Sequence, residues 1–249
     1  MLKVLRLTFR AVKEITGTIL VRIAAWLGFV LSCCAVILIT KDALIDQFTA
    51  GMQYPCLMLI WGWVLSLCLA LLYRKDRRNG FIDRFIPNGN GPAAFYVSYR
   101  LCSVMHYAVL ALTWLMLSVI FDLWPPETGA GGLYMMLLPW DTLTAFGLLA
   151  AAASERRRII VPVMILGGIG LIWLSSWFVS PALFGEVLYG LIRLLPSEQT
   201  VLWTRAFAPG QSPLEDPALL PVYDALLTLA GLAVIAAKEK RRPFYGRQA

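Results

Sequence analysis

His106, Asp141 and Asp224 are ionisable side chains inside long apolar stretches of this sequence. A titratable group in such surroundings is costly to bury, so it often marks a polar pathway, a proton relay or a ligand site. Asp141 closely follows Pro139, and proline is common in the first turn of a helix. This spacing favours a capping or edge position for Asp141, with a polar site inside the bundle as the alternative. Asp224 is expected at an interface with water.

The single histidine, His106, raises the question of haem or metal ligation. Such sites need further ligands near the first one. The five cysteines form no C-x-x-C pair and show no zinc-like spacing. We therefore interpret His106 as a packed or interface-facing histidine, with a polar intramembrane site as the alternative, and expect no cofactor or metal on this chain.

The sequence contains none of the catalytic motifs that we considered. The sequence contains no H-E-x-x-H motif, and no Ser/His/Asp set is consistent with the position of its single histidine. It also contains no Gly-Lys dipeptide and therefore no phosphate-binding loop of the G-x-x-x-x-G-K-[ST] type. We predict that the chain is not an enzyme, and that any ATP it depends on is bound by a partner chain.

Composition indicates which solvent surrounds these residues. The chain has 249 residues, of which 59% are hydrophobic and 15% charged, with a mean hydropathy of +0.70. Soluble proteins have about a quarter of their residues charged. Because so few polar side chains cannot cover a water-facing surface, the sequence predicts a membrane protein.

Six apolar stretches are each long enough to cross a bilayer as a helix, which needs about 20 residues. They show no strict alternation of the kind that barrel strands require. We therefore predict an all-α polytopic membrane protein with spans at residues 19–40, 54–73, 101–121, 133–153, 159–179 and 219–237.

Basic residues indicate the orientation of these spans. Eighteen of the 22 Lys and Arg residues lie beside or between spans on one predicted side, Arg22 lies within the first span, and Lys41, Arg193 and Arg205 lie on the other side. Lys and Arg accumulate in cytoplasmic loops. Both termini are therefore predicted to be cytoplasmic, and the net charge of +7 is explained by anionic lipid headgroups without a nucleic-acid partner.

The chain then divides into three parts. Residues 1–18 are predicted to form an amphipathic interfacial helix whose basic side chains, including Arg6, Arg10 and Lys13, face headgroups. A cleavable signal peptide is disfavoured because the following apolar run is too long. Residues 19–237 are predicted to form a six-helix transmembrane domain, and residues 238–249 a basic cytoplasmic tail. Within the domain, we expect a cytoplasmic loop at residues 74–100, called the coupling loop below, and an outer segment at residues 180–218.

The coupling loop opens with the densely charged sequence YRKDRRNGFIDRF. One interpretation is a solvated loop that binds headgroups. The other is a short amphipathic helix, because aromatic and apolar side chains alternate with charges before N-G-N-G-P breaks any helix. Such a helix suits a groove on a cytoplasmic motor domain.

This segment resembles a known family. LYRKDRRNGFIDRF is similar to the first cytoplasmic loop of the CcmB-like family, with Tyr73, Asp76, Gly80 and Asp83 at the family's characteristic positions. LTAFGLLAAAASERRRIIVPVMILGGIGLIWL resembles that family's fourth and fifth spans, joined by a tight basic turn. The length and the six-span layout also match.

The resemblance implies a function. CcmB-like proteins are membrane permease subunits of the ABC-type complex for cytochrome c maturation, also called the haem exporter, in the bacterial inner membrane. Expected partners are a CcmA-like ABC ATPase, other cytochrome c maturation membrane subunits and a haem chaperone, with haem a candidate substrate of the complex. Apolar anchors and rim charges of the loop would contact the ATPase: Asp76, Arg77, Arg78, Gly80, Phe81, Ile82, Asp83, Arg84 and Phe85.

Two further segments carry open alternatives. The turn at Glu155, Arg156 and Arg157 is either an inner-face anchor, which the sequence favours, or a second ATPase contact. The outer segment reads as an interfacial or re-entrant helix broken at Pro196. The small-residue run at 167–170 allows close helix contact, either within the bundle or across a homodimer.

Two rival functions remain at this level. One is an ABC exporter permease for another hydrophobic substrate. The other is a membrane scaffold that transports nothing and anchors its partners.

Overall fold

The computed structural model describes residues 2–15, 19–42, 47–81, 92–120, 137–154, 156–173, 183, 185–206 and 219–241. These residues contain helices and no strand, as the predicted all-α class requires. The helices are α1 (Leu2–Ile15), α2 (Ile19–Asp42), α3 (Gln47–Arg78), α5 (Pro92–Ile120), α7 (Leu137–Ala153), α8 (Arg157–Trp173), α9 (Gly185–Ile192), α10 (Pro196–Ala206) and α11 (Leu219–Arg241).

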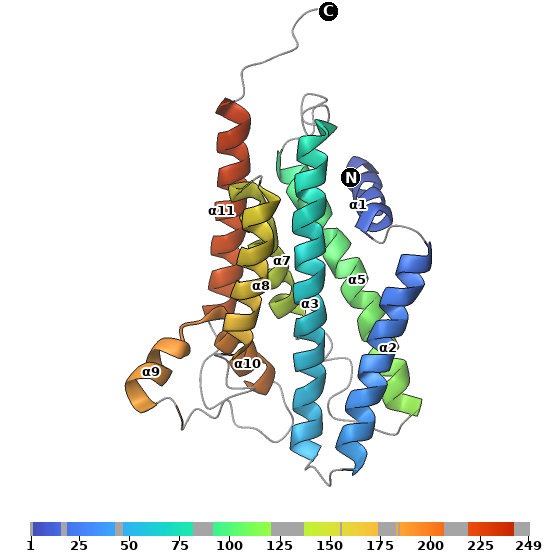
Figure 1. Ribbon diagram of the computed structural model, residues 1–249. Coiled ribbons are helices and arrows are strands. Elements are labelled where there is room, and N and C mark those ends of the chain that lie inside the picture. Colours follow the sequence, from blue (N-terminus) through green and yellow to red (C-terminus); the bar gives the residue numbers. More distant parts are fainter. Residues whose placement is uncertain are drawn as a thin grey trace, which may run out of the picture.

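The long helices run side by side, with α3 near the centre of the view in Figure 1. The N-terminal helix α1, the end of α3, the start of α5 and the end of α11 lie at one end of the bundle, while α9 and α10 lie toward the other (Figure 1). We call the first the charged end, because Lys75, Asp76 and Arg77 of α3 lie there.

Two helices in the described residues are long and apolar enough to cross a membrane, over Ala93–Leu117 and Leu219–Lys238. A third and a sixth span were predicted in these regions. A core helix of a soluble protein would be mostly buried, but only 33% and 17% of these two apolar windows are buried. Shorter apolar helices occupy Ile23–Ala35 and Leu137–Ala153.

Large apolar side chains cover the outward faces of several helices. Leu31, Met116, Ile120, Leu166 and Leu229 each expose more than 60% of their surface. Exposed apolar area on this scale marks contact with a membrane or another protein. Together with the two long apolar helices, it supports a membrane-associated chain.

Two helix boundaries differ from those predicted. Helix α3 continues through residue 78 instead of ending at residue 73, and α5 begins at Pro92 instead of residue 101. The α3 helix stops where Gly80 adopts a φ of 65° and its N–H donates to the carbonyl of Arg77. Glycine adopts this left-handed conformation at no steric cost, so it commonly follows a helix end. Residues 74–78 therefore extend α3, and the prediction of a separate surface helix is wrong for them.

The outer segment follows the predicted pattern where it is described. Helix α9 ends before Pro196, and α10 begins at that proline. Val187 and Leu191 of α9 are exposed, as an interfacial helix requires. Helix α10 packs against α11 and α8.

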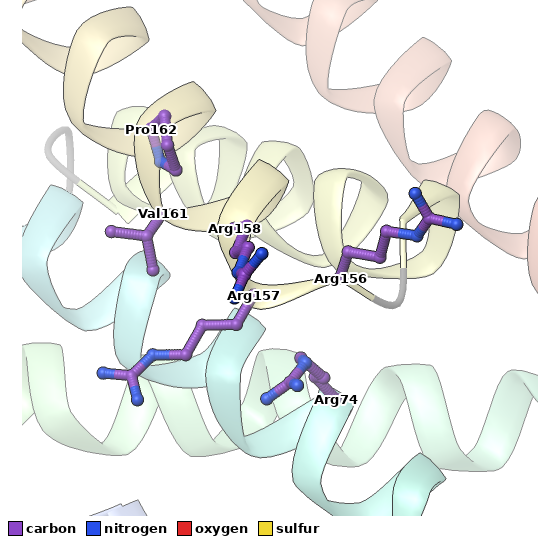
Figure 2. Close-up of a pocket in the computed structure, with 6 residues that line it drawn as sticks. All are labelled: Arg74, Arg156, Arg157, Arg158, Val161 and Pro162. Atoms are coloured by element: carbon purple, nitrogen blue, oxygen red, sulfur yellow. The ribbon is translucent and has the colours of Figure 1, made fainter.

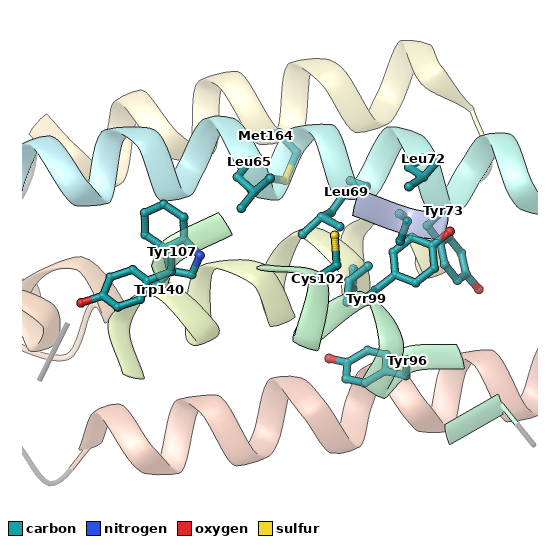
Figure 3. Close-up of a cluster of buried hydrophobic side chains, with 14 of the residues drawn as sticks. Leu65, Leu69, Leu72, Tyr73, Tyr96, Tyr99, Cys102, Tyr107, Trp140 and Met164 are labelled. Atoms are coloured by element: carbon teal, nitrogen blue, oxygen red, sulfur yellow. The ribbon is translucent and has the colours of Figure 1, made fainter. Parts of the chain in front are cut away.

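The core lies between α3, α5 and α7, and Figure 3 shows part of it. Helices α3 and α7 approach closely because small residues face each other there. A Cβ at Gly147 would lie 2.2 Å from the Ser66 hydroxyl oxygen, and one at Gly62 would lie 2.9 Å from the Trp140 ring. The Ser66 hydroxyl donates a 2.6 Å hydrogen bond to the Leu143 carbonyl across the same contact.

In the small-residue run at 167–170, one glycine makes a close contact within the chain. A Cβ at Gly168 would lie 2.1 Å from Nε1 of Trp63, whereas Gly167 and Gly170 face open space within 4 Å. The indole N–H of Trp63 donates to the Met164 carbonyl at 2.7 Å, one turn before Gly168.

We predict that Gly147→Ala lowers the melting temperature of the detergent-purified chain. The added methyl group must displace Ser66, and overpacking of this kind costs about 1–3 kcal/mol. Gly167→Ala is the matched control, because it meets open space and gains about 1 kcal/mol of helix propensity. Equal melting temperatures for the two variants would contradict the close α3–α7 contact.

Candidate functional site

Arg100 lies between two carboxylates contributed by other helices. Its Nε atom donates to Oδ1 of Asp141 at 2.8 Å, and its Nη2 atom bonds the second oxygen of the same carboxylate. Nη2 also donates to Oδ1 of Asp224 at 2.7 Å, and Nη1 donates to the hydroxyl of Thr228. We call Arg100, Asp141 and Asp224 the charge triad.

The triad joins three helices, and its side chains are largely shielded from solvent. Arg100 is on α5, Asp141 on α7 and Asp224 on α11, and their side chains are 14%, 25% and 18% exposed. Arg100 lies within the apolar stretch Ala93–Leu117. A charge inside such a stretch needs a paired partner, and arginine suits this role because its planar guanidinium binds a carboxylate through two hydrogen bonds.

The triad bears on three expectations. Asp141 is the fifth residue of α7 and not its N-cap, and its carboxylate accepts hydrogen bonds from Arg100. Asp224, expected at an interface with water, is 18% exposed and bonds Arg100. Arg100 was assigned to the coupling loop, because the third span was drawn from residue 101.

A second polar contact lies beside the triad on α5 and α7. The buried Trp140 indole donates to the Ser103 hydroxyl at 2.6 Å, and this hydroxyl lies 2.7 Å from that of Thr144. Tyr107 packs edge-on against the Trp140 ring at 5.2 Å between centroids. These hydrogen bonds fix the register of α5 against α7, and so hold Arg100 opposite Asp141.

His106 does not join the triad. Its Nδ1 atom lies 2.8 Å from the carbonyl of Cys102 on the preceding turn of α5. In the described residues, no three His, Cys, Asp or Glu side chains come close enough together to hold a metal ion. His106 is partly buried, so its geometry leaves both the packed and the interface-facing interpretation open.

A second charged cluster occupies the charged end and is centred on Asp76 of α3. Two nitrogens of Arg10, from α1, donate to its carboxylate at 2.6 and 3.3 Å. The hydroxyl of Tyr99, from α5, donates to the same carboxylate. Asp76 is 2% exposed, so this buried carboxylate ties α1, α3 and α5 together.

Neighbouring contacts reinforce this α1–α3–α5 junction. Lys75 forms a 2.6 Å ion pair with Glu14. The Arg10 guanidinium lies 3.4 Å from the centroid of the Phe81 ring, and Phe81 in turn packs against Phe95 at 6.4 Å. A cation over an aromatic face is attracted by the negative charge density of that face.

The junction changes the assignment of the N-terminal helix. The predicted helix over residues 1–18 is found as α1, but its apolar residues Leu7 and Ala11 are buried against the bundle. Arg10 turns inward to Asp76 and does not face headgroups. Arg6 and Lys13 are exposed, as expected.

The predicted ATPase-contacting residues divide into three groups: those that contact their own chain, those exposed at the end of α3, and those outside the described residues. Asp76, Arg77 and Phe81 contact their own chain; Arg77 is 4% exposed, and its Nη1 donates to the Tyr73 hydroxyl at 3.1 Å. Asp76 and Arg77 are thus not rim charges. Arg78 is exposed beside the Gly80 turn. The others lie outside the described residues: Ile82, Asp83, Arg84 and Phe85.

Of the predicted second contact, Arg156 and Arg157 are exposed at the start of α8, and Glu155 lies outside the described residues. Both arginines line a hollow that Arg74 of α3 also lines (Figure 2).

Several residues of these sites were missed in the sequence. Arg10 and Glu14 stand one turn apart on an amphipathic helix, which is a signal of a paired charged face. Tyr99 and Thr228 gave no signal, because their partners Asp76 and Arg100 are far away in the sequence.

Electrostatics at the charged end favour ionised Glu14. The hydrogen bond from Lys75 lowers the pKa of the Glu14 carboxyl below its ordinary value of 4.5, and the charges of Lys75, Arg10 and Lys13 act in the same direction against partial burial. Glu14 is therefore an anion that holds α1 against α3 at neutral pH.

Comparison with known proteins gives no match, either among protein-family models or among curated proteins.

We predict that Arg100→Gln lowers the free energy of unfolding by about 3–5 kcal/mol, because it leaves two carboxylates in an apolar place without their cation. Replacing both carboxylates as well, with Asp141→Asn and Asp224→Asn, should recover most of the loss, since a neutral set needs no counter-ion. Thermal unfolding in detergent measures both, with Arg6→Gln as the exposed control. A triple variant no more stable than Arg100→Gln would show that unpaired charge is not the cause.

We predict that Glu14→Gln costs up to about 1 kcal/mol of stability at neutral pH, the upper range for a partly exposed ion pair. The folded-state pKa of Glu14 is lowered, so its contribution is present above 4.5 and is lost as the pH falls below that value. Melting temperatures of wild type and variant should therefore converge on acidification. A difference that persists or grows in acid would contradict the ion pair's role.

Proposed function

We propose that this chain is a six-span membrane subunit of an ABC-type transporter complex, similar to the CcmB-like permeases of cytochrome c maturation, in a bacterial inner membrane with both termini cytoplasmic. It binds no nucleotide itself and converts motion of a partner ATPase at the charged end into rearrangement of the bundle. The complex either exports haem or releases a chaperone that carries haem. In both cases haem is not a cofactor of this chain.

The observation that carries the proposal is the position of α5 between the two charged clusters. Tyr99 of α5 bonds Asp76 in the α1–α3–α5 junction, and the next residue, Arg100, bonds Asp141 and Asp224. Consecutive residues of a helix point about 100° apart, so they face different neighbours. Helix α5 thereby connects the charged end to α7 and α11.

The shape of α3 supports the same function. Its 32 residues form one helix, about 48 Å long at 1.5 Å per residue. A force on its charged end acts on a continuous helix that also contacts α7 and α8. Because Asp76 and Lys75 bind α1, the same force moves α1 with α3.

We assign the ATPase contact to the predicted residues that do not take part in the α1–α3–α5 junction. Arg78 is exposed at the end of α3, and residues 82–85 follow it in the sequence. Rim charges of this kind steer a partner and set its register more than they add affinity. Phe81 is better placed as an internal packing residue, since it contacts Arg10 and Phe95.

We predict that a co-expressed CcmA-like ABC ATPase co-purifies with the wild-type chain, and that Arg78→Glu reduces the retained ATPase by about tenfold or more, because the reversed charge opposes its partner. Arg6→Glu, exposed on α1 and equal in charge change, is the control and should retain the ATPase. Covalent haem on c-type cytochromes, followed in membranes by in-gel peroxidase stain, should fall with Arg78→Glu alone.

The outcomes separate the rivals. Loss of the ATPase with normal c-type cytochromes would indicate an exporter of another hydrophobic substrate. An ATPase that never co-purifies, or that binds Arg78→Glu as well as wild type, would contradict the transporter proposal and favour a membrane scaffold.

A further inference from the structure

A hollow of about 720 Å³ lies at the charged end, where α3 finishes and α8 begins. It is distinct from both the charge triad and the α1–α3–α5 junction. Four arginines form one side of it, and two apolar side chains of α8 complete it. Figure 2 shows the lining residues, which are Arg74, Arg156, Arg157, Arg158, Val161 and Pro162.

Three of the four lining arginines, those at the start of α8, have no carboxylate partner among the residues that the structure describes. Arg156, Arg157 and Arg158 are exposed, and no described carboxylate forms an ion pair with any of them. By contrast, Arg10 and Arg100 each bond carboxylates within the chain. Several guanidinium groups around one hollow repel one another until an anion lies between them.

The helix itself adds to this preference. Helix α8 begins at Arg157, so its first turn and the positive end of its dipole lie at the hollow. Guanidinium groups bind phosphate oxygens through paired hydrogen bonds. The chemistry of the charged side therefore selects a phosphate group.

The apolar side selects what is attached to that phosphate. Val161 and Pro162 open the hollow onto α8, whose apolar residues Ile159, Val163 and Leu166 are 45%, 44% and 69% exposed. In a membrane this surface contacts acyl chains. A free phosphate would fill the charged side alone, whereas a phospholipid places its headgroup there and its chains along α8.

We propose that this hollow binds the headgroup of an anionic phospholipid, with its phosphate between the arginines and its acyl chains along the exposed face of α8. Basic pockets between membrane helices on the cytoplasmic side are suited to such headgroups. The lipid would brace α8 against α3 at the charged end. The proposal requires a membrane and does not depend on the transporter function.

Native mass spectrometry of the full-length chain in detergent tests this proposal with added phosphatidylglycerol, phosphatidylcholine or inorganic phosphate. We expect phosphatidylglycerol to bind at least about tenfold more tightly than phosphatidylcholine, and free phosphate not to displace it. The triple variant Arg156→Gln, Arg157→Gln and Arg158→Gln should lose this preference. The matched control is a triple variant that removes three positive charges elsewhere: Arg6→Gln, Lys13→Gln and Arg78→Gln.

Each other result overturns the proposal. Equal loss in both triple variants would show general attraction to basic surface, and displacement by inorganic phosphate would show a free-phosphate site. If lipid binding is unchanged but a co-expressed ATPase no longer binds the first triple variant, the hollow is a protein contact. Should that variant fold poorly, the single change Arg157→Gln, checked by its melting temperature, must still weaken phosphatidylglycerol binding relative to Arg6→Gln.

Discussion

One arginine held between two aspartates determines how this bundle closes. Arg100 bonds Asp141 and Asp224 from two other helices inside an apolar section, where an unpaired charge of either sign is very unfavourable. Apolar side chains alone would allow α5, α7 and α11 to slide or rotate, since lipid contacts are as apolar as helix contacts. Directional hydrogen bonds from one guanidinium remove that freedom and fix the rotation of all three helices.

The rest of the packing follows from this constraint. With α7 held against α5, Gly147 and Ser66 bring α3 to within backbone contact, and Trp140 fills the space between α3 and α5. The residue before Arg100 on α5, Tyr99, bonds Asp76 of α3, and Asp76 in turn bonds Arg10 of α1. The N-terminal helix is consequently a part of the bundle and not a separate surface element.

The sequence predicts the positions of the helices better than the contacts between their charged side chains. Apolar runs locate the helices, because burial in lipid or protein requires them, and Pro196 correctly predicts the break between α9 and α10. Asp141 was recognised as unusual, yet its partner was not, since the run of charges before Pro92 concealed where α5 begins. Asp76 was assigned to a partner protein because a buried ion pair with Arg10, 66 positions away, has no local signature. Pairings of this kind depend on which faces meet, and one chain's composition does not contain that information.

The order of the triad along the chain has a consequence for biosynthesis. In the proposed membrane subunit, α5 precedes α7 and α11 in the chain, so Arg100 would enter the bilayer ahead of Asp141 and Asp224 and arrive as a cation without counter-ions. An arginine at the centre of a membrane helix costs about 2.5–3.5 kcal/mol on insertion scales, and less when its long side chain reaches back to the interface. Helix α5 is therefore expected to sit shallow in the bilayer at first, and to reach its final depth only when α7 delivers the first aspartate.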